Sequence, residues 1–141
     1  MLAHRILLAA AASGALLLGG CHAEATAPAQ HEQVKAGSVD QVDSSQLESL
    51  TQQGTAILVD VRSPEEFAAG HIAGAVNQPL ESFDPAKVPQ EVGKQTVLYC
   101  RTGKRSEIAA GKMAKAGEDA THLTGGIVAW EKAGLPIAKG E

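Results

Sequence analysis

The chain has 141 residues, the length of about one domain, and its 44% hydrophobic and 20% charged residues are typical of a folded globular protein rather than a disordered one. With 12 basic against 16 acidic residues the net charge is -4, which disfavours non-specific binding to the phosphate backbone of a nucleic acid. Aromatic residues make up only 3% of the chain, so we expect a core of aliphatic side chains and alanine.

The first 20 residues have the pattern of a bacterial export signal. A short basic start precedes an apolar run over residues 6–18, which is shorter than the roughly 20 residues that a membrane-spanning helix needs. The sequence LGGC that ends at Cys21 resembles the lipoprotein signal, in which cleavage before the cysteine leaves a diacylglycerol on its sulfur. We therefore predict a lipoprotein signal peptide over residues 1–20 and lipidation of Cys21. The alternative is an ordinary cleavage site with a chance cysteine.

Lipidation of Cys21 bears on the second cysteine and on where the protein resides. A lipidated Cys21 cannot form a disulfide with Cys100, so Cys100 would be a free thiol outside the cytoplasm. The residue immediately after Cys21 is not aspartate, and in this respect the sequence resembles lipoproteins that are sorted to the outer membrane. We expect a protein of the bacterial cell envelope, held to a membrane by its lipid and facing the periplasm.

The segment after the signal separates the anchor from the folded domain. Residues 21–37 contain almost no large apolar side chain and show no periodicity, which predicts a flexible tether. The folded domain is expected over residues 38–140, close to the most common domain size.

A helix and a strand are the first elements predicted in this domain. Ser45 and Glu48 have the spacing of a capping box for a helix over residues 45–53, which Gly54 would end. The apolar run over residues 55–61 is nearly continuous, as in a strand that is covered on both faces.

The next helix has a strong start signal. Ser63 provides the cap, Pro64 occupies the first helical position, and Glu66 lies three residues after the cap. A short strand is predicted over residues 75–77.

The second half of the domain repeats the alternation of strand and helix. The predicted elements are strands over residues 96–99 and 120–123, a helix over 105–116 that Gly117 ends, and a last helix that follows Gly125 and Gly126 and reaches Trp130. Ile108, Ala109, Met113 and Ala116 are expected on the buried face of the helix over 105–116. The alternation predicts an α/β fold, a parallel sheet flanked by helices on both faces, with ligands at the carboxyl ends of the strands.

Cys100 follows a predicted strand directly and begins a loop that leads into a helix. The loop residues are Cys100, Arg101, Thr102, Gly103, Lys104, Arg105 and Ser106. Backbone N–H groups in such a loop can surround one point, and a helix N-terminus favours a thiolate over a thiol. Arg101, Lys104 and Arg105 place three positive charges within five residues of an otherwise acidic chain, and these charges also favour a thiolate. We therefore predict that Cys100 is a reactive thiolate, open to an incoming reactant. The alternative is a small buried hydrophobic residue at the end of a strand.

The pKa of the thiol indicates how much the loop must contribute. Lowering it from about 8.5 to about 6.5 requires roughly 2.7 kcal/mol of preference for the charged form. A helix end supplies roughly 0.3 to 1 kcal/mol and occasionally about 2 kcal/mol. The loop N–H groups and the neighbouring cations would have to supply the remainder.

Four ordered blocks of the sequence resemble the rhodanese family. They are Asp60-Val61-Arg62 with Glu66-Phe67, then Gly70 to Ala75, then Cys100 to Ser106, and finally Gly125 to Trp130. The likeness covers roughly residues 38–136 and implies a single rhodanese-like domain.

The resemblance implies a sulfurtransferase. Cys100 would take a sulfane sulfur from thiosulfate or from a persulfide or polysulfide, hold it as a persulfide, and pass it to a thiol or to cyanide. Residues 101–106 would bind the anionic donor and stabilise the persulfide. The resemblance implies no metal and no organic cofactor.

Two alternatives belong to other classes of function. A binding module could use the same loop to dock a sulfur-carrying partner, or sense persulfide, without turnover. Related folds that act on phosphate or arsenate have five residues between cysteine and arginine, whereas only four separate Cys100 from Arg105. The shorter loop disfavours a phosphatase or an arsenate reductase.

Four further residues are expected to support the site rather than to react. Asp60 and Arg62 end a strand, and Glu66 could pair with a nearby cation. His71 is expected to hold a loop by a hydrogen bond rather than to act as a general base, because a thiolate of lowered pKa has little need of one. Gly125 and Gly126 are expected to allow close approach to the loop of Cys100.

Overall fold

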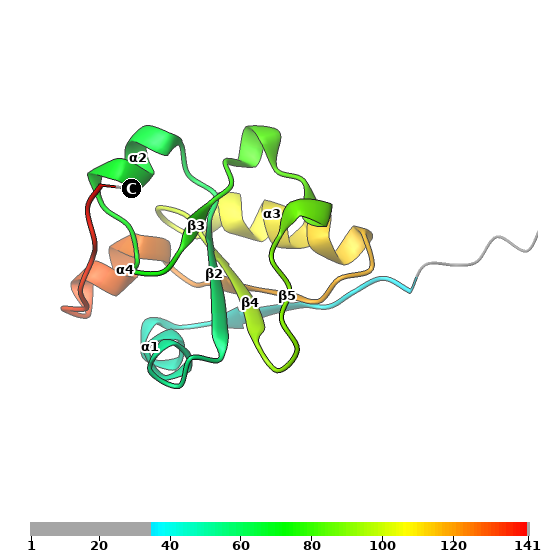
Figure 1. Ribbon diagram of the computed structural model, residues 1–141, viewed down its shortest axis with the longest axis horizontal. Helices are drawn as coiled ribbons and strands as arrows, with labels where there is room; N and C mark the ends of the chain where they lie inside the picture. The colour runs from blue at the N-terminus through cyan, green and yellow to red at the C-terminus, as the bar shows by residue number, and fades with distance from the viewer. Residues whose placement is uncertain (1–34, 141) are drawn as a thin grey trace, which may run out of the picture. The chain divides into compact units, whose positions relative to one another are not determined.

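A five-stranded parallel β-sheet lies at the centre of the computed structural model, which describes residues 35–140 (Figure 1). Its strands are β1 (Val39–Val42), β2 (Ala56–Asp60), β3 (Val76–Asn77), β4 (Gln95–Tyr99) and β5 (Ala120–Leu123). The strand order is β1-β5-β4-β2-β3, and every pairing between strands is parallel.

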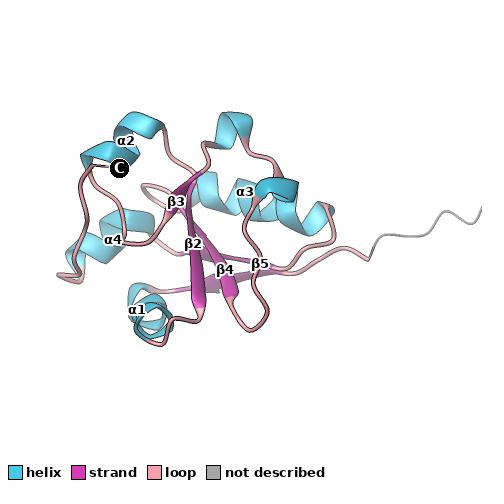
Figure 2. Ribbon diagram, viewed as in Figure 1, coloured by secondary structure: helices cyan, strands magenta, loops and turns pink. Residues whose placement is uncertain are grey.

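Within residues 35–140, three α-helices connect these strands and a fourth follows the last strand. They are α1 (Ser44–Gln52), α2 (Pro64–Ala69), α3 (Lys104–Lys115) and α4 (Gly126–Lys132). Two short 3-10 turns, Leu80–Ser82 and Pro85–Lys87, lie between β3 and β4. Figure 2 shows how these helices and turns surround the strands.

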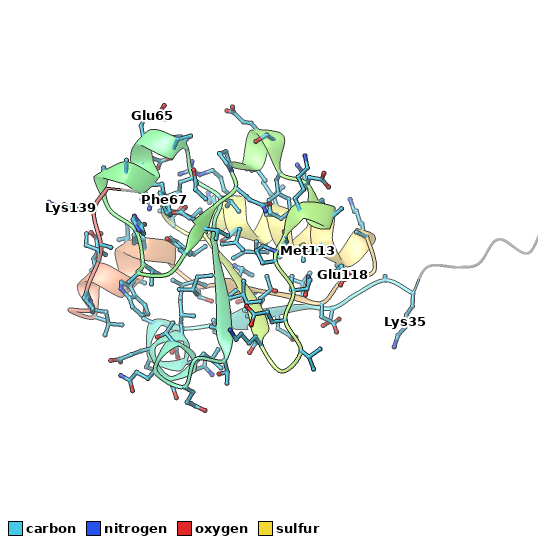
Figure 3. All side chains as sticks on the ribbon, viewed as in Figure 1. Lys35, Glu65, Phe67, Met113, Glu118 and Lys139 are labelled. Carbon is cyan, nitrogen blue, oxygen red and sulfur yellow. The ribbon has the colours of Figure 1, made fainter. Side chains whose placement is uncertain are left out.

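The sheet is covered on both faces, because successive strand residues point to opposite sides. In β4, Leu98 packs toward α3 with Ala109 and Met113. Of these residues, Figure 3 labels Met113. The neighbouring Val97 packs on the opposite face in a cluster that contains Leu47 of α1 and residues of α4. The predicted α/β fold with helices on both faces is therefore confirmed.

The start of α2 agrees with the prediction from the sequence, whereas the start of α1 does not. Ser63 and Glu66 form the predicted capping box, with the Glu66 N–H donating to Ser63 Oγ at 3.3 Å. At α1, however, the cap is Asp43, whose carboxylate accepts from the Gln46 N–H at 2.9 Å. The prediction of Ser45 as this cap is wrong. The chain leaves β1 at Val42, so Asp43 is the first residue free to cap.

Two other features differ from the prediction. The edge strand β1 is not predicted from the sequence, because three of its four residues are exposed and it carries no continuous apolar run. On α3, Ala109 and Met113 are buried as expected, but Ile108 is 55% exposed. Ala110 takes the buried place beside Ala109, so the apolar face of this helix is rotated from the predicted one.

Several predictions concern the start of the chain. The signal peptide over residues 1–20, the lipidated Cys21 and most of the tether lie outside the described residues. Within residues 35–140, no helix has both the length and the apolar character needed to cross a membrane.

Candidate active site

The candidate site lies at the carboxyl ends of β2 and β4. Cys100 directly follows β4, and the register of the sheet pairs Tyr99 with Asp60 at the end of β2. The chain turns from Cys100 into α3, which begins at Lys104. Parallel sheets of this kind place ligand sites at this edge, as the sequence analysis predicts.

Backbone N–H groups of the loop point at the sulfur of Cys100. The Gly103 N–H donates to Sγ at a distance of 3.1 Å. Gly103 has a φ of 100°, a left-handed conformation that glycine adopts without strain and that turns the loop back over the sulfur. The N–H groups of Thr102 and Ser106 also act on the sulfur. The loop therefore forms the predicted group of donors around one point.

The surroundings of Cys100 favour its thiolate. Burial opposes this and by itself raises the pKa of the thiol, but the N–H groups of Ser106, Thr102 and Gly103 outweigh it, so the pKa of Cys100 is lowered. The Ser106 hydroxyl, 3.8 Å from Sγ, acts in the same direction. The same hydroxyl donates a hydrogen bond of 2.9 Å to the carbonyl oxygen of Gly103, so Ser106 also stabilises the conformation of the loop.

The start of α4 holds the loop in this conformation. The Ile127 N–H donates to the carbonyl of Cys100 at 2.8 Å, and the Val128 N–H donates to the carbonyl of Arg101 at 3.2 Å. Gly126 lies so close that an added Cβ would come within 2.5 Å of the Arg101 carbonyl oxygen. The predicted close approach is confirmed for Gly126. The role of the α4 backbone is not readable from side-chain types, and the paired glycines are its only signal in the sequence.

The sulfur is less accessible than expected. Cys100 is only 1% exposed, and it belongs to the buried apolar cluster that also contains Val61, Leu98 and Ala109. The outer turn of the loop, Arg101 and Thr102, is exposed. The expectation of an open sulfur is therefore wrong, although N–H groups of the loop also act on Sγ.

Arg105 forms an ion pair with Glu66 of α2. Two guanidinium nitrogens donate to the two carboxylate oxygens at 2.7 and 2.8 Å. The hydrogen bonds from Arg105 lower the pKa of Glu66 to about 2 despite partial burial. The predicted pairing of Glu66 with a cation is thus confirmed. The sequence suggests Arg105 as a donor-binding residue, but the structure engages two of its nitrogens with Glu66.

Arg101 and Lys104 are the other cations of the loop. Both are exposed, and within residues 35–140 neither takes part in an ion pair. Their charges therefore remain available to an anion at the loop.

Asp60 and Arg62 form a buried ion pair beneath the site. Asp60 is 0% and Arg62 6% exposed, and Arg62 Nε donates to both carboxylate oxygens at 2.9 and 3.0 Å. Arg62 also donates to the carbonyl of Gly70 at 2.7 Å, which ties the end of β2 to the end of α2. The pair has the framework position that the sequence suggests.

His71 lies in the turn between α2 and β3. Its Nδ1 is 3.0 Å from the carbonyl oxygen of Phe67, and its ring stacks on the Phe67 ring with centroids 3.8 Å apart. Because a carbonyl only accepts, Nδ1 carries the proton in this arrangement. These contacts are those of a residue that holds a turn rather than those of a general base. Figure 3 labels Phe67 on α2.

The site has the donor set of an anion site and not that of a metal site. The groups at the loop are N–H donors and cations around one sulfur. Over the described part of the chain, no three side chains of His, Cys, Asp or Glu lie together as metal ligands.

Comparison with known proteins identifies the family. The model of the Rhodanese-like domain matches residues 43–133, which is more than half of the chain. The chain belongs to the rhodanese family. The matched range contains β2, β4, the loop of Cys100 and α4, so all parts of the candidate site belong to the rhodanese domain.

Relatives and solved structures agree with this rhodanese assignment. An uncharacterized protein of Synechocystis sp. is 48% identical over 94 residues, which cover 66% of this chain and 52% of that protein. The chain thus spans about half the length of this relative. A protein of Allochromatium vinosum named sulfurtransferase is 35% identical over 107 residues, 73% of this chain and 98% of that one. The crystal structure of a rhodanese-like domain protein from Staphylococcus aureus has a TM-score of 0.61 at 26% identity and covers 71% of this chain and 99% of that one.

Proposed function

We propose that this rhodanese domain is a sulfurtransferase that carries sulfur on Cys100. The rhodanese family and the sulfurtransferase-named relative support a role in sulfur transfer in general. The observation that carries the finer proposal is the contact of 3.1 Å between the Gly103 N–H and Cys100 Sγ, in a loop whose N–H groups lower the pKa of this thiol. A thiolate is the nucleophilic form of cysteine.

The first step loads the sulfur. The Cys100 thiolate attacks the outer sulfur of thiosulfate and forms a new S–S bond. The S–S bond of thiosulfate breaks, its electron pair leaves with sulfite, and Cys100 becomes a persulfide anion. A persulfide or polysulfide donor reacts in the same way and releases a thiolate or a shorter polysulfide. Neither metal nor organic cofactor takes part in this step.

The charges of the loop suit these anions. Arg101 and Lys104, both exposed and outside any ion pair of the described residues, attract the donor to the loop. The N–H groups of Thr102 and Gly103 then hold the negative charge of the persulfide. Arg105, paired with Glu66, adds positive potential near the sulfur and fixes the start of α3.

Loading requires the loop to admit the donor, because Cys100 is 1% exposed. The outer turn at Arg101 and Thr102 moves aside to expose Sγ. One hydrogen bond of 3.2 Å, from the Val128 N–H to the Arg101 carbonyl, restrains this turn from α4. Once loaded, the outer sulfur lies about 2.05 Å beyond Sγ, closer to the surface of the loop.

The second step discharges the sulfur. Cyanide or a thiolate attacks the outer sulfur, the bond to Sγ breaks, and its electron pair returns to Cys100 as the thiolate. The products are thiocyanate from cyanide or a new persulfide from a thiol. We place this reaction at the periplasmic face of the bacterial envelope, on a protein anchored by lipid at Cys21. Because the residue immediately after Cys21 is not aspartate, we place the anchor in the outer membrane.

The burial of Cys100 favours a second candidate function. A rhodanese module that binds a sulfur-carrying partner, or senses persulfide, needs the loop but no rapid exchange of small molecules at the sulfur. Such a protein would load sulfur and keep it.

Mass spectrometry of the purified chain tests the proposal. Thiosulfate is expected to add the mass of one sulfur atom, and cyanide to remove it as thiocyanate. The Cys100→Ser variant is expected to do neither. A loaded protein that never discharges would support the binding or sensing module instead. Release of phosphate from an aryl phosphate would support the phosphatase class, and an absence of loading would overturn sulfur transfer.

A further inference from the structure

A cleft lies beside the loop of Cys100, between α2, α4 and the C-terminal segment. Its volume is about 400 Å³, within the range of small-molecule sites. Arg101, the residue that follows Cys100, lines this cleft, so a molecule bound there lies next to the loop. We call it the acceptor cleft.

Part of the wall of the acceptor cleft is apolar. Ala69 of α2, Ile127 and Val128 of α4, and Ile137 near the C-terminus contribute this part. Val128 is 38% exposed although it is a large aliphatic residue. These side chains suit the uncharged part of a small organic molecule.

Two charged residues of the cleft are already paired. Arg62 is bound to Asp60, and Glu66 is bound to Arg105. Neither group offers a full charge to a ligand.

Two other charged residues of the cleft remain available. Arg101 lies on the loop and Glu131 on α4, one turn after Val128, and both are exposed. Within residues 35–140 neither forms an ion pair, with the other or with any further residue. A cation and a carboxylate on separate walls of one cleft match a ligand that carries a carboxylate and an ammonium group.

We propose that the acceptor cleft binds the sulfur acceptor, and that this acceptor is a small zwitterionic thiol such as cysteine or a short peptide of it. Its carboxylate binds Arg101 and its ammonium group binds Glu131. The thiolate of the bound acceptor attacks the outer sulfur of the Cys100 persulfide. The bond between that sulfur and Sγ breaks, the electron pair stays on Sγ as a thiolate, and the acceptor leaves as a persulfide. This inference rests on the proposed sulfurtransferase function.

The test compares two acceptors that differ in one charged group. Cysteine carries both ammonium and carboxylate, whereas 3-mercaptopropionate lacks the ammonium group. The full chain is loaded with thiosulfate, and KM is measured for each thiol in the wild type, in Glu131→Gln and in Glu118→Gln. Glu118 is also exposed but lies at the other end of β5 from α4, so its variant is a control for the loss of one carboxylate (Figure 3).

The expected readout is the ratio of the two KM values. Intrinsic reactivity differs between the two thiols, but it cancels when the same pair is compared across variants. Loss of one charge-assisted contact is expected to raise the KM for cysteine relative to 3-mercaptopropionate about tenfold in Glu131→Gln. The ratio in Glu118→Gln is expected to equal that of the wild type.

Failure of the inference and failure of the proposed function give different results. A persulfide that forms, and discharges to both thiols with the same KM ratio in Glu131→Gln as in the wild type, overturns the acceptor cleft alone. An equal change in both variants overturns it too, because a general loss of charge then explains the effect. If no persulfide forms with thiosulfate, the proposed function fails and the acceptor cleft fails with it.

Discussion

Substitution of Gly126 by alanine tests how the start of α4 holds the loop of Cys100. Gly126 has a φ of 61°, and an alanine in the left-handed region costs about 1–2 kcal/mol. The added Cβ would also fall 2.5 Å from the Arg101 carbonyl oxygen, so the loop must move. Two hydrogen bonds, from the Ile127 and Val128 N–H groups, are weakened by this movement and together contribute about 1–3 kcal/mol. The expected loss is therefore about 2–5 kcal/mol of unfolding free energy.

Gly134→Ala is the matched control for this substitution. Gly134 has a similar φ of 75°, but nothing lies within 4 Å of the position of its Cβ. Both variants share the backbone strain and the change in the unfolded chain, so their difference isolates the contact with the loop. Denaturant unfolding is expected to find Gly126→Ala less stable by about 1–3 kcal/mol, with a raised pKa of the Cys100 thiol. Equal stability and an equal thiol pKa in the two variants would refute the proposed bracing of the loop.

Three further substitutions test the support of the site. Glu66→Gln is expected to lose about 1 kcal/mol, since the side chains of this pair are 37% and 34% exposed. The pKa of Glu66 in the folded protein, about 2, lies below its ordinary value of 4.5. The loss of unfolding free energy is therefore complete above about pH 4.5 and becomes smaller as the pH falls toward 2. A loss that stays constant across this pH range would contradict the ion pair of Glu66 with Arg105. Asp60→Asn leaves the charge of Arg62 buried and is expected to lose about 3–5 kcal/mol in thermal or denaturant unfolding; a loss under 1 kcal/mol would contradict the buried pair. Ser106→Ala removes one of the two hydrogen bonds to the Gly103 carbonyl, since the Glu107 N–H still donates to it, and is expected to lose about 0.5–1.5 kcal/mol and to raise the thiol pKa; a thiol that titrates as in the wild type would contradict the role of Ser106.

Local signals predicted much of the fold. The capping box of Ser63 and Glu66 correctly predicts where α2 begins, and the bounds of β5 agree with the predicted residues 120–123. Both depend on residues that are close in sequence. The edge strand β1 depends instead on its parallel pairing with β5, far along the chain, and its own sequence carries too few apolar residues to reveal it.

The chemistry of the site was predictable in type but not in arrangement. The residue types of the loop predict N–H donors around Cys100, and the structure has them. The pairing of Arg105 with Glu66 joins residues 39 positions apart, and only the tertiary fold brings them together. The conformation of the loop likewise depends on α4, whose N–H groups bind the carbonyls of Cys100 and Arg101.

Titration of the Cys100 thiol measures directly whether the loop stabilises a thiolate. The ultraviolet absorbance of the thiolate is followed against pH in the full chain, and the signal of the Cys100→Ser variant is subtracted. We expect a midpoint below the ordinary thiol value of about 8.5, because the loop N–H groups outweigh burial. A midpoint at or above that value would contradict this expectation and would leave Cys100 as a buried thiol at the end of a strand.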